Sequence, residues 1–264
     1  MRQSSVLMCR PPSKISGNSA GNDPFRKIDL ALASDEWQRL HDCLKKDFRL
    51  KVEVLPAPEN LPWMSFAAGA GVTNKRTYVR SSFRRPHRCE EERHFENWFR
   101  KKGFIVKTLE RPLGFQGERE VLEIAGELYI GYRFRSETEG HEILAKYLKK
   151  RYFALEIPDE RFYDIDTCLA PLGERTALVY LGAFEPYAQM ILRENIPDLI
   201  RVSTKEALRL ACNLIEIGGR VILPEGCPQT REELERRKFK VTELDFSEWV
   251  KLGGAAKSLV LRLR

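Results

Sequence analysis

The stretch Phe95–Leu109, FENWFRKKGFIVKTL, joins a charged helical pattern to a short β-prone run. Its apolar residues Phe95, Trp98 and Phe99 are spaced i, i+3 and i+4, which predicts a helix with one buried face. Basic residues end the helical pattern, and the apolar residues around Ile105 then predict a strand. The stretch therefore predicts a helix followed directly by a strand.

The same unit occurs five times along the chain, and this repetition is the strongest physical signal in the sequence. The copies follow one another at intervals of about 40–50 residues. Their β-prone runs lie near Val52, Ile105, Phe153, Ile200 and Lys240. Four of the helices follow another short apolar run that ends in a turn, and we expect Ser4–Pro11 to supply the matching strand of the first copy.

Each unit is therefore expected to contain a strand, a turn, a helix and a strand, with a linking strand before the next copy. Five units that close into a ring would bury their strands centrally and carry their helices outside. A closed ring leaves no sheet edge unpaired, which suits a monomer. The repeats alone also allow an open array.

The composition predicts a soluble globular protein, because 42% of the 264 residues are hydrophobic and 31% are charged. No apolar run approaches the roughly 20 residues that span a bilayer, and the first residues lack the apolar core of a secretory signal. The six cysteines are scattered, without a CxxC pair or a close His/Cys set. We expect a cytoplasmic protein with no membrane contact, metal or cofactor.

A net charge of +7 makes nucleic acid a candidate partner. The placement of the charge argues against it, since basic doublets recur at the last turn of the predicted helices, where cations complement the helix dipole. These doublets are Lys45–Lys46, Lys101–Lys102, Lys149–Lys150 and Arg236–Arg237. Only Arg80–Arg88, RSSFRRPHR, is dense enough to remain a candidate anion site. Nucleic acid is therefore an unlikely partner.

Several segments, in this order and spacing, resemble the dimethylarginine dimethylaminohydrolase and amidinotransferase families. They include LGFQGEREVL (113–122), LYIGYRFRSE (128–137), DERFYDIDTCLAPL (159–172), LACNLIEIGGRVILP (210–224) and GGAAKS (253–258). The resemblance covers nearly the whole chain. It implies an α/β fold of the pentein type, a five-bladed αβ propeller of five pseudo-repeats, in a single domain spanning residues 1–264.

What is known of these families implies a mechanism for guanidine chemistry. A cysteine thiolate attacks the guanidinium carbon, a histidine handles the proton of the leaving amine, and carboxylates clamp the guanidinium nitrogens. This sequence departs from that pattern, with Ser258 at the position of the cysteine and Asp164 at the position of the histidine. Gln116 stands where a glutamate is usual and Glu120 where an aspartate is usual, whereas Asp166 is retained.

The ligand-binding positions also differ in part from the family pattern. The segment LPWMSFAAGAG (61–71) matches one that carries a substrate-binding aspartate and an asparagine, and Trp63 and Gly69 replace them here. The resemblance assigns the ligand pocket to Trp63, Phe66, Gly69, Arg135, Asn213 and Gly254. Residues 11–24 are expected to form a polar loop over the site, in a region where relatives have a lid.

No other residue is an evident replacement for the missing groups. The four histidines, His41, His87, His94 and His141, all lie outside the catalytic positions of the family, and only His141 follows a candidate site segment closely. Cys168 is the best spare thiol, although its short apolar strand suggests a core residue. Cys227 is expected in an exposed turn.

Three functions remain open. The first, which we favour from sequence, is a catalytically inactive homologue whose carboxylates Glu120, Asp164 and Asp166 still hold a guanidino or amino-acid ligand. The second is an active hydrolase or amidinotransferase that acts on arginine-like guanidino substrates with Ser258 in place of cysteine. The third is a non-enzymatic pentein that binds a macromolecule. The expected partner is an arginine-like small molecule, and the chain is expected to be a monomer or a homodimer.

Overall fold

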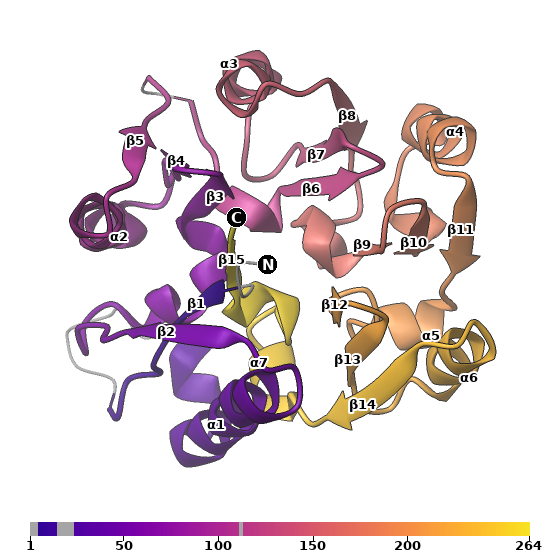
Figure 1. Cartoon of the computed structure of the whole chain (residues 1–264), viewed down its shortest axis with the longest axis horizontal. Coiled ribbons are helices and arrows are strands. Elements are labelled where there is room, and N and C mark those ends of the chain that lie inside the picture. Colours follow the sequence, from indigo (N-terminus) through magenta and orange to yellow (C-terminus); the bar gives the residue numbers. More distant parts are fainter. Residues whose placement is uncertain (1–4, 15–23, 111–112) are drawn as a thin grey trace.

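The computed structural model describes residues 5–14, 24–110 and 113–264, which form five three-stranded sheets arranged in a ring. Figure 1 shows the longer helices at the outside of the ring and the sheets directed towards its centre. This arrangement confirms the predicted α/β fold of five repeated units. Within the described residues, no helix is long and apolar enough to cross a membrane.

The five sheets share one topology, in which a central strand is parallel to one neighbour and antiparallel to the other. The central strands are β1 (Ser5–Cys9), β4 (Thr77–Arg80), β7 (Glu127–Tyr132), β10 (Thr176–Val179) and β13 (Arg220–Pro224). Their parallel neighbours are β2 (Lys51–Leu55), β5 (Ile105–Lys107), β8 (Tyr152–Glu156), β11 (Asp198–Arg201) and β14 (Lys240–Leu244). The antiparallel neighbours are β15 (Leu261–Leu263), β3 (Gly71–Asn74), β6 (Val121–Ile124), β9 (Leu169–Leu172) and β12 (Ile215–Ile217). All five predicted β-prone runs are thus strands, and the first unit does take its matching strand from the N-terminal segment.

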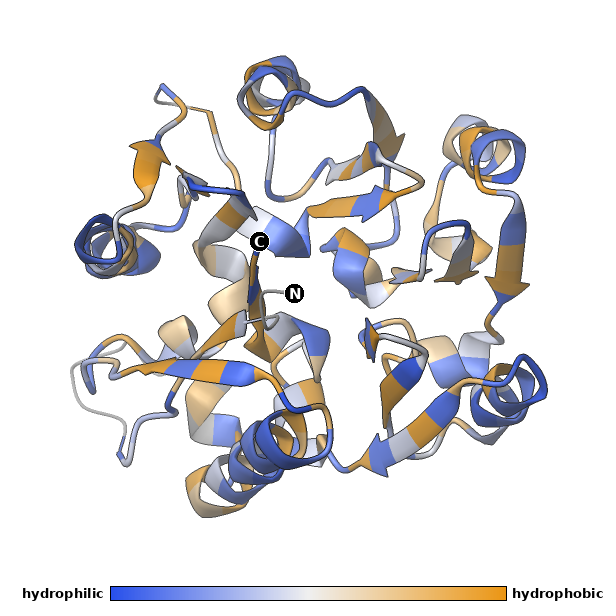
Figure 2. Cartoon of the chain, in the orientation of Figure 1, coloured by the Kyte–Doolittle hydropathy of each residue, from blue (hydrophilic) through white to orange (hydrophobic). Residues whose placement is uncertain are grey.

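One peripheral helix joins each central strand to its parallel neighbour, as the repeat predicts. These helices are α1 (Leu30–Lys46), α2 (Cys89–Lys101), α3 (Thr138–Leu148), α4 (Pro186–Asn195) and α6 (Pro228–Arg236). In Figure 2, α3 and α4 carry both orange and blue residues, as expected for helices with one buried face, whereas α6 is almost wholly blue. The buried residues of α6 are Thr230 and Leu234. Two short helices, α5 (Thr204–Ala207) and α7 (Ser247–Val250), complete the set of α-helices in the described residues.

The two ends of the chain close the ring in one sheet. β15 pairs with β1 in antiparallel register, with Leu7 opposite Leu261 and Ser5 opposite Leu263. β15 and the C-terminal end of the chain lie near the centre of Figure 1. Closure therefore depends on contacts between residues at opposite ends of the sequence.

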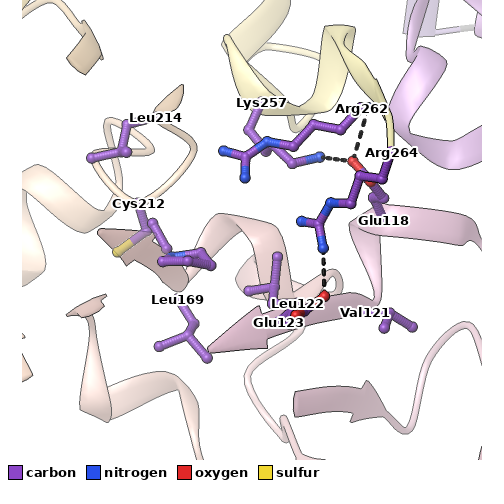
Figure 3. Close-up of a pocket in the computed structure, with 12 residues that line it drawn as sticks. Glu118, Val121, Leu122, Glu123, Leu169, Cys212, Leu214, Lys257, Arg262 and Arg264 are labelled. Carbon is purple, nitrogen blue, oxygen red and sulfur yellow. Dashed lines mark hydrogen bonds and ion pairs between the residues drawn. The ribbon is translucent and has the colours of Figure 1, made fainter. Parts of the chain in front are cut away.

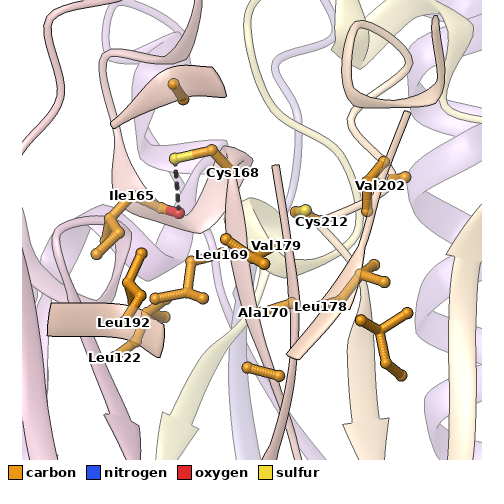
Figure 4. Close-up of a cluster of buried hydrophobic side chains, with 14 of the residues drawn as sticks. Leu122, Ile165, Cys168, Leu169, Ala170, Leu178, Val179, Leu192, Val202 and Cys212 are labelled. Carbon is orange, nitrogen blue, oxygen red and sulfur yellow. Dashed lines mark hydrogen bonds between the residues drawn. The ribbon is translucent and has the colours of Figure 1, made fainter. Parts of the chain in front are cut away.

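Several hydrophobic clusters fill the space between sheets and helices. The largest surrounds β9 and β10, where Leu169, Leu178 and Val179 are fully buried (Figure 4). Cys168 and Cys212 belong to this cluster, and the Cys168 thiol lies 3.6 Å from the carbonyl oxygen of Ile165. Cys168 is therefore a core residue, as its sequence context predicts.

Short 3-10 turns at the inner ends of the sheets carry the candidate site. They are η2 (Pro62–Ser65), η3 (Ala67–Ala70), η5 (Gly117–Arg119), η7 (Ile165–Thr167) and η9 (Lys257–Leu259). η3 packs against both η5 and η9, and η5 packs against η7. Turns from four of the five repeats therefore converge on one small region.

Candidate active site

The side chains of Ser258, Asp166 and Asn213 form a buried hydrogen-bonded group. Ser258 Oγ donates to Asp166 Oδ2 at 2.8 Å and accepts from Asn213 Nδ2 at 2.9 Å. Asn213 Oδ1 in turn accepts from the backbone N–H groups of Ala255 at 2.8 Å and Ser258 at 3.1 Å. The amide of Asn213 thus fixes both the loop before Ser258 and the hydroxyl group itself.

The glycine pair before Ser258 allows this loop to pack closely. Gly253 has a φ of +79°, which favours glycine, and a Cβ there would lie 2.0 Å from Tyr163 Oη. A Cβ on Gly254 would lie 2.5 Å from Phe66 Cε1 and 2.8 Å from Ser258 Cβ. The two glycines therefore bring the Ser258 backbone next to Phe66 and Tyr163, which no larger residue would permit.

Asp164 and Asp166 face the side chain of Arg119, a residue that the sequence analysis did not assign to the site. Arg119 Nη2 lies 2.7 Å from Asp164 Oδ2 and donates to the carbonyl oxygen of Gly253 at 2.7 Å. Arg119 Nε lies 3.8 Å from Asp166 Oδ2. The guanidinium also lies over the ring of Phe66, with 5.0 Å between Cζ and the ring centroid. The predicted carboxylates therefore do surround a guanidinium, and it belongs to the chain itself.

The carboxylates of the site have unusual proton affinities because they are buried close together. Burial and the charge of Asp164 raise the pKa of Glu120 to about 8, so this side chain is largely protonated at neutral pH. Burial also raises the pKa of Asp166, while the nearby Arg119 opposes that rise. The site therefore holds Asp166, which accepts a hydrogen bond from Ser258, and Glu120, whose carboxyl group retains its proton more readily than an ordinary glutamate.

The predicted ligand residues fall into two groups. Phe66, Asn213 and Gly254 belong to the site just described, and Arg135 lies at its edge, where its Nε is 4.0 Å from Asp164 Oδ1 and its guanidinium stacks on Tyr163.

The second group, Trp63, Gly69 and Gln116, surrounds another buried arginine, Arg88. Arg88 donates to the Trp63 carbonyl oxygen and to Gln116 Oε1, both at 3.4 Å, and a Cβ on Gly69 would lie 3.5 Å from its Nη2. Gln116 is linked to the first group by its backbone N–H, which donates to Glu120 Oε2 at 2.6 Å.

The spare groups considered from sequence lie outside the contacts of Ser258. His141 is buried in α3 beside Tyr132 and Tyr152, and burial lowers its pKa to about 4. Cys227 is fully buried, which corrects the expectation of an exposed turn, because it immediately precedes α6 and packs into the largest cluster. Burial raises the pKa of both Cys168 and Cys227, so neither is an activated thiol.

The basic segment Arg80–Arg88 is largely neutralised by neighbouring carboxylates. Arg80 pairs with Glu92 and Glu96, Arg84 with Glu137, and the buried Arg88 with Glu91. These pairs leave little free positive charge for a phosphate backbone. The lid expected at residues 11–24 falls mostly outside the described residues.

A small charged cavity is lined by Glu118 and Lys257, the chain neighbours of Arg119 and Ser258 (Figure 3). Lys257 Nζ pairs with Glu118 Oε2 at 2.9 Å, and Arg264 Nη1 pairs with Glu123 Oε2 at 2.5 Å. Its volume of about 20 Å³ leaves room for about one water molecule. Glu118 precedes Arg119 and Lys257 precedes Ser258 in the chain. Their ion pair therefore fixes the two turns relative to each other.

The ring of five three-stranded sheets is a fold of the pentein type. A family model described as eukaryotic N,N dimethylarginine dimethylhydrolase matches residues 19–263. The chain belongs to this family.

Curated relatives include the bifunctional arginine dihydrolase/ornithine cyclodeaminase ArgZ of Synechocystis sp., which is 35% identical over 98% of this chain. This chain spans only 37% of ArgZ and 33% of the similar enzyme AgrE of Nostoc sp.. The dimethylarginine dimethylaminohydrolase of Mycobacterium tuberculosis is 29% identical over 91% of this chain and 79% of its own length. A solved structure of the N-terminal domain of ArgZ has a TM-score of 0.92, with 33% identity and 98% of each chain covered.

These comparisons contradict the prediction of a catalytically inactive homologue. The relatives are named as enzymes, and structures of the N-terminal domain of ArgZ hold a substrate, a product or a covalently bound reaction intermediate. The substrate complex was obtained with a cysteine-to-serine variant. The prediction rested on the loss of a thiol and a histidine, and it did not anticipate that Asp166 contacts the Ser258 hydroxyl or that burial and Asp164 raise the pKa of Glu120.

Proposed function

We propose that the chain is a C–N hydrolase that acts on the guanidino group of an arginine-like compound, with Ser258 as its nucleophile. The observation that carries the proposal is the hydrogen bond from Ser258 Oγ to Asp166 Oδ2 at 2.8 Å, inside a site whose relatives are named as arginine dihydrolases and dimethylarginine dimethylaminohydrolases. A serine needs an adjacent base to attack, and Asp166 is the base in contact with it.

Each step of the proposed reaction has a residue for its proton. Ser258 Oγ forms a bond to the guanidinium carbon, and its proton passes to Asp166. The bond between that carbon and the departing nitrogen breaks, and the amine leaves with a proton from Glu120, whose pKa is raised to about 8 by burial and by the charge of Asp164. Water then adds to the same carbon as one of its protons passes to Glu120. The bond from that carbon to Ser258 Oγ breaks, Oγ regains its proton from Asp166, and a ureido product is released.

Binding of the substrate is assigned to the groups that hold a guanidinium in the structure. Asp164 supplies a buried carboxylate, Phe66 an aromatic face and Gly253 a carbonyl oxygen. Arg135, at the edge of the site, is assigned to the carboxylate of an amino-acid substrate. We further propose a cytoplasmic location, which the six free cysteines support.

The test is product formation from a panel of guanidino compounds, with L-arginine, methylated arginines and agmatine assayed for ureido products, ornithine and ammonia. Wild-type protein is expected to release product, and Ser258→Ala is expected to release none. Ser247→Ala is a matched control, since the Ser247 hydroxyl also donates to a buried carboxylate, Glu36 Oε1 at 3.0 Å, outside the hydrogen-bonded group of Ser258. Wild-type protein without product on any compound, or Ser258→Ala with undiminished activity, would refute the proposal.

A further inference from the structure

Arg119 is held in the way that a protein recognises a free guanidinium ion. Its partners are a carboxylate at 2.7 Å, a backbone carbonyl oxygen at 2.7 Å, a second carboxylate at 3.8 Å and an aromatic ring. They come from three separate parts of the chain, around Phe66, Asp164 and Gly253. Carboxylate forks and an aromatic face are the groups that match a planar guanidinium.

The other buried arginine near the site is held differently. Arg88 pairs with Glu91, three residues further along the chain at the start of α2, through two hydrogen bonds of 2.9 and 2.8 Å. That pair is local and satisfies both groups. The partners of Arg119 are distant in sequence, and Arg119 Nε and Asp166 Oδ1 have no hydrogen-bond partner among the described residues. Arg119 therefore occupies this site while leaving some of the buried polar atoms there without a hydrogen-bond partner.

Arg119 lies beside the group that contains the proposed nucleophile, Ser258, so its position affects substrate binding. Asp166 Oδ2 accepts the hydrogen bond of the Ser258 hydroxyl and also lies 3.8 Å from Arg119 Nε. Ser258, Asp164, Asp166 and Arg119 are each at most 2% exposed. A substrate guanidinium that reaches Ser258 must therefore take the place of the Arg119 side chain.

We propose that Arg119 is an internal guanidinium ligand and the residue that limits which compounds enter the site. This inference rests on the proposed function, because it assigns the place of the substrate. Binding requires the Arg119 side chain to leave Asp164. A second cation then remains beside this carboxylate, because Arg135 Nε lies 4.0 Å from Asp164 Oδ1. The backbone of η5 stays in place, since a Cβ on Gly117 would lie 2.5 Å from the Ala68 carbonyl oxygen and the turn is tightly packed. An internal ligand of this kind weakens the binding of a free guanidino compound, because only the molecules in which Arg119 has left the site can bind it. The apparent dissociation constant is the intrinsic one divided by the fraction of such molecules.

The test compares binding to Ser258→Ala proteins that carry Arg119, Arg119→Ala or Arg119→Met, by titration calorimetry with methylguanidine and L-arginine. Arg119→Ala empties the site and is expected to lower the dissociation constant of both compounds by roughly tenfold or more. Arg119→Met removes the charge but still fills the space, so its affinity is expected to remain weak. N-methylurea, which is neutral and of similar shape, is expected to bind none of the three.

Two results would overturn the inference. One is equal affinity for methylguanidine with and without Arg119, and the other is an equal increase in affinity for Arg119→Ala and Arg119→Met. If Arg119→Ala does not fold alone, methylguanidine in the refolding buffer is expected to restore folded protein. If methylguanidine does not restore folding although Arg119→Met folds, that result also contradicts the inference. The proposed function is separable, because binding is measured without Ser258. Improved binding together with no product from Arg119→Ala carrying Ser258 would refute the hydrolase and leave the internal ligand standing.

Discussion

At the scale of single residues, the site depends on how burial changes the chemistry of ordinary side chains. A serine hydroxyl and an aspartate replace the thiol and histidine of the family pattern, and neither would act alone at neutral pH. Burial and the charge of Asp164 raise the pKa of Glu120 to about 8, and the packing of the turns places Asp166 in hydrogen-bond contact with Ser258. The chemistry of the site is therefore set by its surroundings more than by residue type.

The raised pKa of Glu120 predicts a specific dependence of stability on pH. The folded protein holds the Glu120 proton up to about pH 8, whereas an unfolded glutamate loses it near the ordinary value of 4.5. The contribution of this group to the free energy of unfolding is therefore full below about pH 4.5 and is lost as the pH rises towards 8. Glu120→Gln, which stays neutral, should become more stable than wild type across this range, as measured by urea denaturation at several pH values.

The control for this prediction is Glu142→Gln. Glu142 is exposed on α3 and pairs with Lys146, which lowers its pKa, so its replacement should leave the pH dependence of the wild type in place. A stability difference between Glu120→Gln and wild type that does not change with pH would show that Glu120 is ionised in the folded protein.

At the scale of elements, the site is assembled by tight turns at the inner ends of the sheets. Repetition in the sequence predicts the strands and helices well, because each unit repeats the same periodic pattern. The turns could be located only through the resemblance, and their side-chain contacts could not be predicted. The segment GEREV gives no sign that Arg119, rather than its neighbours Glu118 and Glu120, would turn towards Asp164, since charged neighbours in a turn look alike in sequence.

The loop before Ser258 provides a test of this assembly. Gly253→Ala adds a Cβ where φ is +79° and where Tyr163 Oη would lie 2.0 Å away, so it carries both backbone strain and a clash. Gly173→Ala is the matched control, because φ is +76° there and no atom lies within 4 Å. We expect about 1 kcal/mol of destabilisation for the control and about 1–3 kcal/mol more for Gly253→Ala, measured by chemical denaturation.

A double variant separates the two contributions. Tyr163→Phe removes the hydroxyl that meets the added Cβ, and it should recover part of the extra loss in Gly253→Ala. Equal destabilisation by Gly253→Ala and Gly173→Ala would mean that the loop does not pack against Tyr163.

At the scale of the whole molecule, the ring is closed by strands from opposite ends of the chain. The sequence repeats alone also allowed an open array, because pairing of β15 with β1 is a long-range contact that no local pattern encodes. The resemblance to penteins decided for closure, and the structure confirms it. That residues 1–264 form a single domain stays a prediction.

Closure and the single domain can be tested together. Leu261→Ala removes a fully buried side chain from β15 and should cost about 2–5 kcal/mol, with one cooperative unfolding transition seen by both far-UV and near-UV circular dichroism. Ile105→Ala is the control, since Ile105 on β5 is 59% exposed and its loss should cost under about 0.5 kcal/mol. Two separate transitions would indicate that the repeats do not unfold as one domain.

The role of Ser258 as nucleophile is tested most directly by mass spectrometry of the intact protein and of its proteolytic peptides, after quenching in acid at intervals following mixing with L-arginine. The wild-type protein is predicted to gain, transiently, the mass of arginine less ammonia, on the peptide that contains Ser258. Ser258→Ala is predicted to show no such gain at any time. A wild-type protein that never carries this adduct, or a Ser258→Ala protein that carries it equally, would contradict a covalent mechanism at Ser258.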